Sequence, residues 1–353
     1  MKFLNTHKYN SNENLWKIYG EYMFLPFDFI NSLKLRILRK LKLGDYPHIV
    51  NFSITKKCNL KCFMCHIWKL KSKKEVSLEK VEKIFSSKIF RKTRLVKLTG
   101  GETTLHSKLP EIIEIISEKS KKAKISINTN CFTFKRVRNV ILECLKVRED
   151  LIFSMSLDGI GKIHDKVRGV NGAFKEVMKT TSFLEKLKDK YPIRFRYSCT
   201  INPINVYELP KIIEFAKSKD TYVGFRLVHI NSYYNNNDLQ NFKFTKEQLE
   251  FLRSYVPKVA ENYFKFHIFF RRNIPCFGFV NSVFIDSDGK VHKCIYTRNG
   301  IDGENLDKVW NNSFGRRLRS FSKCINCWSD CQTIPDLLAE YLHEKVYQKH
   351  KRL

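Results

Sequence analysis

Short apolar runs alternate with longer amphipathic stretches between residues 49 and 228. Runs of apolar and β-branched residues predict strands, and the amphipathic stretches between them predict helices. Strands joined through helices pair in parallel, so the alternation predicts an α/β fold built on a partial (β/α)6 TIM-like barrel. The expected strands are Ile49–Thr55, Leu95–Leu98, Lys124–Asn128, Ile152–Ser156, Ile193–Thr200 and Tyr222–Val228, and the expected helices are Ser77–Phe85, Leu109–Lys119, Phe134–Leu145, Ala173–Lys188 and Leu209–Ser218.

The alternation stops after this region, and a different organisation follows. The polar stretch Asn231–Asn241 predicts a loop, and Phe244–Phe264 predicts a helix. Further on, an Asp-Gly pair predicts a hairpin turn between the strands Val283–Ile285 and Lys290–Cys294. We therefore expect an N-terminal helical extension at 1–48, the barrel at 49–230, a connecting loop and helix at 231–275, a small C-terminal cysteine-rich auxiliary domain at 276–335, and a basic C-terminal helix or tail at 336–353.

The chain is strongly basic, with 65 Lys and Arg against 35 Asp and Glu. Such an excess indicates either a compositional bias toward lysine or a surface for nucleic acid, membrane or an acidic substrate. No nucleic-acid motif accompanies the charge, so nucleic acid is not an expected partner.

The sequence also bears on localisation. No run of eighteen apolar residues is present, and Met1–Glu13 lacks the apolar core of a signal peptide. These features predict a cytoplasmic protein. The basic end of the segment Leu15–Leu43 allows two interpretations: a helix packed on the barrel, or a helix at an anionic membrane surface that would make the protein membrane-peripheral.

The eleven cysteines fall mainly into two groups. Cys58, Cys62 and Cys65 directly follow the first predicted strand, and five more lie between Cys276 and Cys331. In a reducing compartment, clustered cysteines indicate metal binding rather than disulfides. The isolated Cys131, Cys144 and Cys199 are interpreted as buried thiols, and Cys131, at a strand end, could also line a site.

A loop after a parallel strand lies at the catalytic end of such a barrel. Three thiolates can hold a [4Fe–4S] cluster while leaving one iron without a protein ligand, and an open coordination position is what chemistry at a metal requires. The alternative is a zinc site with His66 as the fourth ligand.

The Cys58-x3-Cys62-x2-Cys65 pattern resembles the signature of the radical S-adenosylmethionine (SAM) superfamily. The resemblance implies that SAM chelates the open iron and is reductively cleaved to a 5′-deoxyadenosyl radical, which abstracts hydrogen from a substrate. It further implies an electron donor such as flavodoxin or ferredoxin. Met64 fits the apolar position that the family places near the adenine.

Later strand ends are similar to other motifs of the family. The segment Gly100-Gly101-Glu102 resembles its Gly-Gly-Glu motif, which contacts the amino group of SAM, although Thr103 stands where proline is usual. Glycines allow close backbone approach, and a carboxylate suits an ammonium group. Asn128 begins a segment similar to Thr-Asn-Gly, in which Cys131 replaces the glycine.

The fourth and sixth strands continue the resemblance. Ser156-Leu-Asp158-Gly159, followed by Arg168-Gly169, resembles a segment of the superfamily's peptide and cofactor maturases. The resemblance implies that Ser156 and Arg168 hold the carboxylate of SAM and that Asp158 lies near its ribose. Val228 would contact the adenine.

The second cysteine group is similar to the auxiliary-cluster domains called SPASM and Twitch, and its five cysteines suit the shorter, single-cluster form. A structural zinc site is the alternative, because four thiolates also suit zinc. Cys331 could replace one of the last two ligands. The expected ligands of this auxiliary [4Fe–4S] cluster are Cys276, Cys294, Cys324 and Cys327.

These features predict a radical SAM enzyme that oxidises or otherwise modifies a C–H bond of a carbohydrate, a lipid-linked small molecule or a peptide. The short region before the barrel favours a small substrate over a peptide. The alternatives are a radical SAM enzyme that modifies RNA and a zinc-stabilised nucleic-acid-binding protein. Candidates for substrate contact are Asn130, Ser198 and Arg226.

Overall fold

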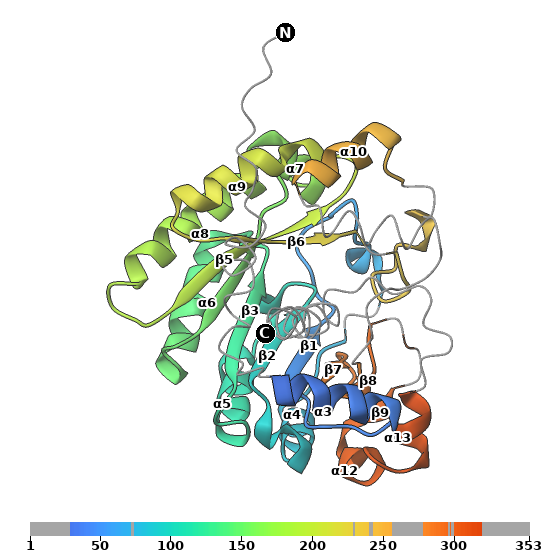
Figure 1. Ribbon diagram of the computed structural model, residues 1–353. Coiled ribbons are helices and arrows are strands. Elements are labelled where there is room, and N and C mark those ends of the chain that lie inside the picture. The colour runs from blue at the N-terminus through green and yellow to red at the C-terminus, as the bar shows by residue number, and fades with distance from the viewer. Residues whose placement is uncertain are drawn as a thin grey trace, which may run out of the picture.

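The computed structural model describes residues 29–71, 74–228, 230–239, 243–255, 278–295, 297 and 300–319. Within these ranges a single nine-stranded sheet has the strand order β6-β5-β4-β3-β2-β1-β7-β8-β9 (Figure 1). Its strands are β1 (Ile49–Thr55), β2 (Leu95–Gly100), β3 (Lys124–Thr129), β4 (Ile152–Ser156), β5 (Arg194–Ile201), β6 (Val223–Leu227), β7 (Ser282–Ile285), β8 (Lys290–His292) and β9 (Ile301–Asp302).

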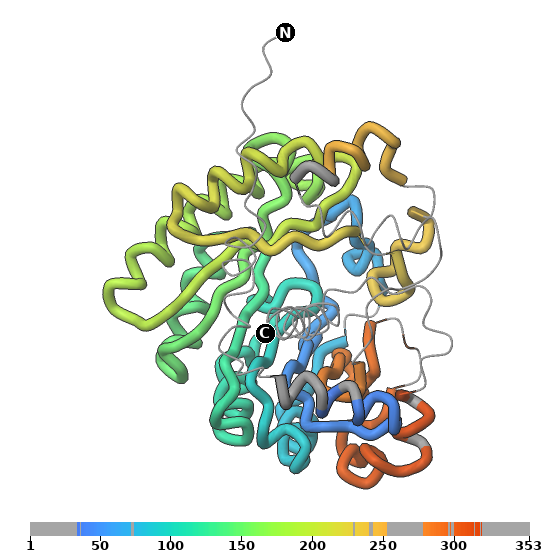
Figure 2. The backbone as a smooth tube through the Cα atoms, viewed as in Figure 1, coloured from blue at the N-terminus to red at the C-terminus, as the bar shows by residue number. Residues whose placement is uncertain are grey.

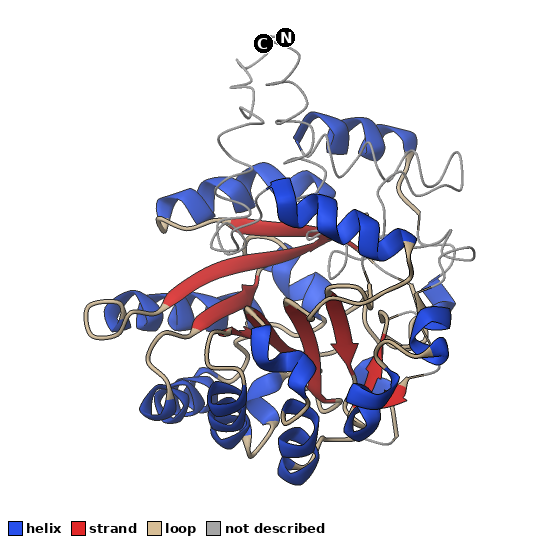
Figure 3. Cartoon of the chain, turned by 60° about the horizontal axis from the view of Figure 1, so that its bottom comes forward, coloured by secondary structure: helices blue, strands red, loops and turns tan. Residues whose placement is uncertain are grey.

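Helices connect the strands and cover the outside of the sheet (Figure 3). The α-helices are α3 (Phe29–Lys40), α4 (Leu78–Phe85), α5 (Leu109–Lys119), α6 (Phe134–Val147), α7 (Lys162–Arg168), α8 (Ala173–Leu187), α9 (Leu209–Ser218), α10 (Lys246–Tyr255), α12 (Leu306–Val309) and α13 (Ser313–Leu318). The short 3-10 helices are η1 (Ile67–Lys69), η2 (Lys88–Lys92), η3 (Thr103–Leu105), η4 (Val206–Glu208), η5 (Asn237–Leu239) and η6 (Gly303–Asn305).

Strands β1 to β6 pair in parallel, each with its neighbour in sequence, so the prediction of a partial (β/α)6 barrel is confirmed. Their bounds lie within one or two residues of the predicted strands. Helix α7 was not predicted; it fills the connection between β4 and α8. Its seven residues are too few for an amphipathic period to stand out from a loop.

The two faces of β1–β6 differ in chemistry. Alternate residues such as Val50, Phe52 and Ile54 pack with the outer helices in the hydrophobic core. Because side chains alternate along a strand, the intervening residues point to the other face, which we call the inner face. Apart from the residues at the strand starts, the inner face includes Asn51, Ser53, Lys97, Thr99, Ser126, Asn128, Ser154, Ser156, Arg196, Ser198, Thr200, Gly224 and Arg226.

A closed barrel usually fills its interior with branched apolar side chains. The polar inner face therefore indicates that this side of the sheet faces ligands or solvent.

The predicted hairpin is confirmed as β7 and β8, which pair antiparallel. The hairpin also pairs through β7 with β1, in parallel, from Ile49↔Ser282 to Phe52↔Ile285. It therefore continues the barrel sheet beyond β1 (Figure 2). The sequence did not predict this contact, because the pairing joins segments more than 200 residues apart.

Other segments predicted from the sequence lie partly within the described ranges. Within Leu15–Leu43 the structure has α3, and within Phe244–Phe264 it has α10. Cys294 is buried after β8, whereas Cys276, Cys324, Cys327, Cys331 and the tail at 336–353 lie outside the described residues. Among the described helices, none is long and apolar enough to cross a membrane.

Candidate active site

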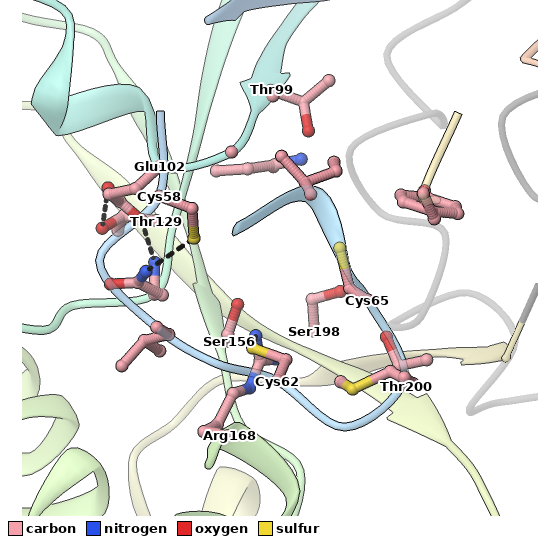
Figure 4. A pocket seen from close by; sticks show the side chains of 18 of the residues that line it. Cys58, Cys62, Cys65, Thr99, Glu102, Thr129, Ser156, Arg168, Ser198 and Thr200 are labelled. Carbon is pink, nitrogen blue, oxygen red and sulfur yellow. Dashed lines mark hydrogen bonds between the residues drawn. The ribbon is translucent and has the colours of Figure 1, made fainter. Parts of the chain in front are cut away.

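The three clustered cysteines lie on the loop that leaves β1, here called the cysteine loop (residues 56–66). Leu60 and Met64 are buried and pack with Val167, and this contact anchors the loop. Figure 4 shows Cys58, Cys62 and Cys65 spread along the loop with their sulfur atoms near a common cavity. Because buried apolar residues alternate with the cysteines along the loop, the three thiols lie near the same cavity.

Two neighbouring segments hold the cysteine loop through its backbone. Gly101 N donates to the carbonyl oxygen of Thr55 at 2.8 Å, and Glu102 N donates to that of Lys57 at 2.7 Å. A Cβ at Gly101 would lie only 2.0 Å from the Lys57 oxygen, so this approach requires glycine.

The second segment follows α7. Gly169 has φ +69°, and a Cβ there would lie 2.2 Å from the Lys61 carbonyl oxygen. Nearby, Phe63 N donates to the carbonyl oxygen of Val167 at 2.9 Å. The loop is therefore held on both sides of Cys58 and Cys62 by backbone contacts that depend on glycine.

The Glu102 carboxylate is only 1 % exposed and binds the neighbouring strand end. Its Oε1 accepts from Thr104 N, Thr104 Oγ1 and Thr129 Oγ1, and its Oε2 accepts from Asn130 N at 2.6 Å. Four protein donors thus use most of its accepting capacity. The Glu102 carboxylate chiefly fixes the ends of β2 and β3 against each other. Glu102 also lines the cavity.

At the end of β3, Asn130 lies beside the cysteine loop. Its Nδ2 donates to Asn59 Oδ1 at 2.9 Å and lies 4.0 Å from Cys58 Sγ. Cys131 follows with φ +62°, which explains why glycine is usual at this position in the resembling motif. Cys131 is fully buried and does not line the cavity, so its interpretation as a buried thiol agrees with the structure.

Arg168 and Asp158 form a buried ion pair, with 2.6 Å between Nη2 and Oδ2. Arg168 Nη1 also lies 3.8 Å from Cys62 Sγ. Burial lowers the pKa of Arg168, but the charges of Asp158 and the Cys62 sulfur more than offset this and raise it above its ordinary value. Arg168 therefore stays charged beside a cysteine of the loop.

Asp158 itself is fully buried and does not line the cavity, although the resemblance placed it near a ribose. Its Oδ1 accepts from Thr200 N at 2.7 Å, and its backbone N donates to His164 Nδ1 at 3.0 Å. The carboxylate thus lies behind Arg168 and orients it.

A segment after β6 closes the other side of the cysteine loop. Asn236 is buried, and its Nδ2 donates to the Met64 carbonyl oxygen at 2.7 Å. His66 N donates to the carbonyl oxygen of Tyr234 at 2.9 Å, and Tyr234 lines the cavity. This polar segment, predicted only as a loop, therefore forms part of the site.

An open cavity of about 980 Å³, its mouth included, lies among these groups at the carboxyl ends of the barrel strands (Figure 4). It is lined by all predicted residues of the cluster and cofactor sites within the barrel except Asp158, namely Cys58, Cys62, Cys65, Met64, Gly100, Gly101, Glu102, Asn128, Ser156, Arg168 and Val228. The predicted substrate contacts Asn130, Ser198 and Arg226 line it too.

Sequence reasoning missed several lining residues. Thr99, Ser154 and Thr200 lie on the inner face two residues from predicted ones, so strand alternation could have identified them. Trp68 and Tyr234 come from irregular segments, and no pattern in the sequence marks them.

The residues present fit a cluster and a polar cofactor. Asn128 Oδ1 and Ser154 Oγ are buried, line the cavity and have no hydrogen-bond partner among the described residues. Buried polar atoms rarely stay unpaired, so a polar ligand in the cavity would satisfy them. No three His, Cys, Asp or Glu side chains in the described ranges converge on one ion. Three thiols on one loop that face one cavity suit the irons of a cluster.

Burial disfavours the thiolate form of the three cysteines. Burial raises the pKa of Cys58 to about 11 and that of Cys65 to about 12, and it raises the pKa of Cys62 as well. The thiolate is the form that binds metal, and bound cations supply the charge that stabilises it in such a site.

Residues 52–216 match the family model of the radical SAM superfamily. These residues form a radical SAM domain. This family uses a [4Fe–4S] cluster and SAM, so the prediction of these two cofactors is confirmed.

Several curated proteins and solved structures resemble the chain. Fe-coproporphyrin III synthase of Methanosarcina barkeri is 28 % identical over 50 % of this chain and 42 % of its own length. The subtilosin biosynthesis protein AlbA of Bacillus subtilis is 30 % identical over 46 % of this chain and 35 % of its own length. This chain therefore spans less than half the length of either relative.

Streptococcus suis SuiB bound to SAM superposes with a TM-score of 0.60 and 17 % identity, over 83 % of this chain and 73 % of that one. This likeness confirms the predicted barrel fold.

Proposed function

We propose that the protein is a radical SAM enzyme that abstracts hydrogen from an organic substrate and so oxidises it or modifies a C–H bond. The observation that carries the proposal is the cysteine loop, held by Gly101 and Gly169 with Arg168 beside Cys62. The family model covers this same region. When bound, the cluster and SAM supply the electron transfer and the 5′-deoxyadenosyl radical.

The chain's own residues would position the cofactors. Cys58, Cys62 and Cys65 would bind three irons, since three thiols face one cavity. Arg168 would bind the carboxylate of SAM together with Ser156, because both line the cavity and Asp158 holds the guanidinium in place.

Other residues that line the cavity would provide the remaining contacts to SAM. The backbone of Gly100 and Gly101 would receive the ammonium group of SAM, because the Glu102 carboxylate is mostly occupied by protein donors. Met64 and Val228 belong to the same hydrophobic cluster and line the cavity, so they would offer apolar contacts to the adenine.

The substrate class stays open among carbohydrate, lipid-linked small molecule and peptide, and modification of RNA remains the alternative. The relatives' names refer to a coproporphyrin synthase and to bacteriocin biosynthesis, so they support the chemistry rather than one substrate. The family match favours an enzyme over the zinc-stabilised nucleic-acid-binding alternative.

An auxiliary cluster on Cys276, Cys294, Cys324 and Cys327, with Cys331 as a substitute ligand, is part of the proposal, as are the division into domains and a flavodoxin or ferredoxin donor. The burial of Cys294 just after the β7–β8 hairpin supports the auxiliary cluster.

We also propose a cytoplasmic, membrane-peripheral location, since α3 exposes Ile37 beside basic Arg39 and Lys40. Absence of sedimentation with anionic liposomes at low salt would remove the membrane part.

The function is tested by anaerobic reconstitution, reduction with dithionite in the presence of SAM, and detection of 5′-deoxyadenosine by mass spectrometry. The wild type should form it, and Cys62→Ala should not. Cys144→Ala is the matched control, because Cys144 is buried on α6 and does not line the cavity. A wild type with full iron that leaves SAM intact would contradict the proposal.

A further inference from the structure

One large apolar side chain of the cysteine loop lies at the protein surface. Phe63 stands between Cys62 and Met64, yet it is 40 % exposed and does not line the cavity. It is one of five large apolar side chains that the described residues expose. Single exposed apolar residues are common on proteins, so the surroundings of Phe63 decide what its exposure indicates.

The surroundings of Phe63 are basic. Residues 56–71 contain five lysines and neither Asp nor Glu. Lys61 is exposed on the cysteine loop, and Lys166 is exposed in the last turn of α7. The two segments are in contact, because Phe63 N donates to the carbonyl oxygen of Val167 at 2.9 Å. We call Lys61, Phe63 and Lys166 the loop patch.

Two acidic side chains near the loop patch are already engaged. Asp165 on α7 accepts from two backbone N–H groups at the start of α8, at 2.7 and 2.8 Å. Asp238 forms an ion pair with His66, with 3.0 Å between Oδ1 and Nδ1. Neither Lys61 nor Lys166 forms an ion pair with another of the described residues. The patch therefore combines an exposed aromatic ring with positive charge.

The loop patch also lies next to the proposed site of the cluster. Lys61 and Phe63 flank Cys62 in the sequence, so only a few covalent bonds separate Cys62 Sγ from the patch. Electron transfer through protein slows steeply as the distance grows. A redox partner that docks on the patch would therefore come close to the cluster that Cys62 would bind.

We propose that the loop patch is the docking surface for the electron donor, an acidic one-electron carrier such as a flavodoxin or a ferredoxin. The docked donor is oxidised by one electron, and the cluster is reduced by that electron before SAM is cleaved. The lysines attract an acidic protein, and the ring adds apolar contact at short range, a combination that suits a small, transient interface. The inference rests on the proposed function and assigns a surface to its donor.

The test measures binding first and electron transfer second. An oxidised flavodoxin and an oxidised ferredoxin are titrated separately into the anaerobically reconstituted protein by calorimetry, at low and at high salt. The wild type should bind at least one of them, and more weakly at high salt, because salt screens surface charges. Stopped-flow kinetics then compares reduction of the cluster by the reduced carrier and by dithionite, a small reductant that needs no docking surface.

Three variants give the comparison. Lys61→Gln/Lys166→Gln should weaken carrier binding about 2- to 30-fold at low salt, as expected for loss of two exposed ion pairs, and should reduce the salt dependence. Phe63→Ser should weaken binding at both salt concentrations, since salt does not screen apolar contact. The matched control Lys121→Gln/Lys122→Gln removes the same charge from exposed lysines just before β3, at the opposite end of the barrel, and should bind like the wild type.

All three variants should keep the iron content of the wild type and its rate of reduction by dithionite. Equal carrier affinity in the wild type and Lys61→Gln/Lys166→Gln would overturn the inference, as would absence of binding to both carriers. An equal loss in Lys121→Gln/Lys122→Gln would also overturn it, because net charge would then set the affinity.

The dithionite reaction separates docking from damage to the cluster site. If the patch variants slow reduction by dithionite as much as reduction by the carrier, the residues act on the cluster itself and the inference is wrong. A wild type that binds no iron, or that leaves SAM intact after reduction by dithionite, would overturn the proposed function itself. The two failures are therefore distinguishable.

Discussion

Replacing Gly169 with alanine tests whether backbone contact holds the cysteine loop. Gly169 has φ +69°, and the new Cβ would lie 2.2 Å from the Lys61 carbonyl oxygen, next to Cys62. Gly172 is the matched control: its φ is +81°, and a Cβ there meets nothing within 4 Å. Both substitutions force alanine into the left-handed region, which costs about 1–2 kcal/mol.

The two variants differ only in the steric clash with the Lys61 carbonyl oxygen, which Gly169→Ala introduces and Gly172→Ala does not. The contact must open from 2.2 Å to at least 3.0 Å, so the cysteine loop or the end of α7 has to move by about 0.8 Å. Overpacking of this kind costs about 1–3 kcal/mol. The free energy of unfolding should therefore fall by about 1–2 kcal/mol in Gly172→Ala and by about 2–5 kcal/mol in Gly169→Ala.

The assay combines urea denaturation of the metal-free protein with iron content and SAM affinity after anaerobic reconstitution. Gly172→Ala should retain the iron and the SAM affinity of the wild type, whereas Gly169→Ala should lose part of both because Cys62 is displaced. Equal stability, iron content and SAM affinity in the two variants would refute the argument that Gly169 positions the loop.

Three further predictions concern buried polar groups around the site. Arg168→Gln leaves the Asp158 carboxylate buried without its ion-pair partner, so urea denaturation should show a loss of about 3–5 kcal/mol, and an unchanged midpoint would contradict the ion pair's role. Burial lowers the pKa of His164 to about 3. As the pH drops below about 6.5, His164 therefore gains a proton in the unfolded chain before it does so in the folded protein. The free energy of unfolding should then fall by up to about 1.4 kcal/mol per pH unit. His164→Asn keeps an acceptor but does not titrate, so unfolding followed from pH 7 to pH 4 should show a flatter slope; an unaltered slope would count against this assignment. Asn236→Ala removes the 2.7 Å hydrogen bond to the Met64 carbonyl oxygen, which should cost about 1–3 kcal/mol and weaken SAM binding in calorimetry, whereas wild-type affinity would show that the segment is dispensable.

Local signals predicted much of the fold and the site. Strands such as Ile49–Thr55 carry apolar, β-branched or aromatic residues at alternate positions, and the cysteine spacing after that strand marks the loop chemically. Because parallel strands end at the same edge of a sheet, residues such as Gly101, Ser156 and Val228 could be placed around one cavity from sequence alone.

Features that depend on non-local contacts were not predicted. Nothing in the sequence indicates that β7 pairs with β1, or that Asn236 donates to the backbone of Met64. Asp158 lies at a strand end like its lining neighbours, yet its side chain turns away to pair with Arg168 and is completely buried. Strand position identifies the end of the barrel at which a residue lies but not whether its side chain reaches the cavity.

The central claim is that Cys58, Cys62 and Cys65 hold one [4Fe–4S] cluster whose fourth iron binds SAM. The most direct measurement compares iron content and the electron paramagnetic resonance spectrum, with and without SAM, in the reduced wild type and in a Cys58→Ala/Cys62→Ala/Cys65→Ala variant. The account predicts that the variant loses about four irons per chain and that the spectral change caused by SAM disappears with them. A variant that keeps the wild-type iron content, or a wild-type spectrum that does not respond to SAM, would contradict it.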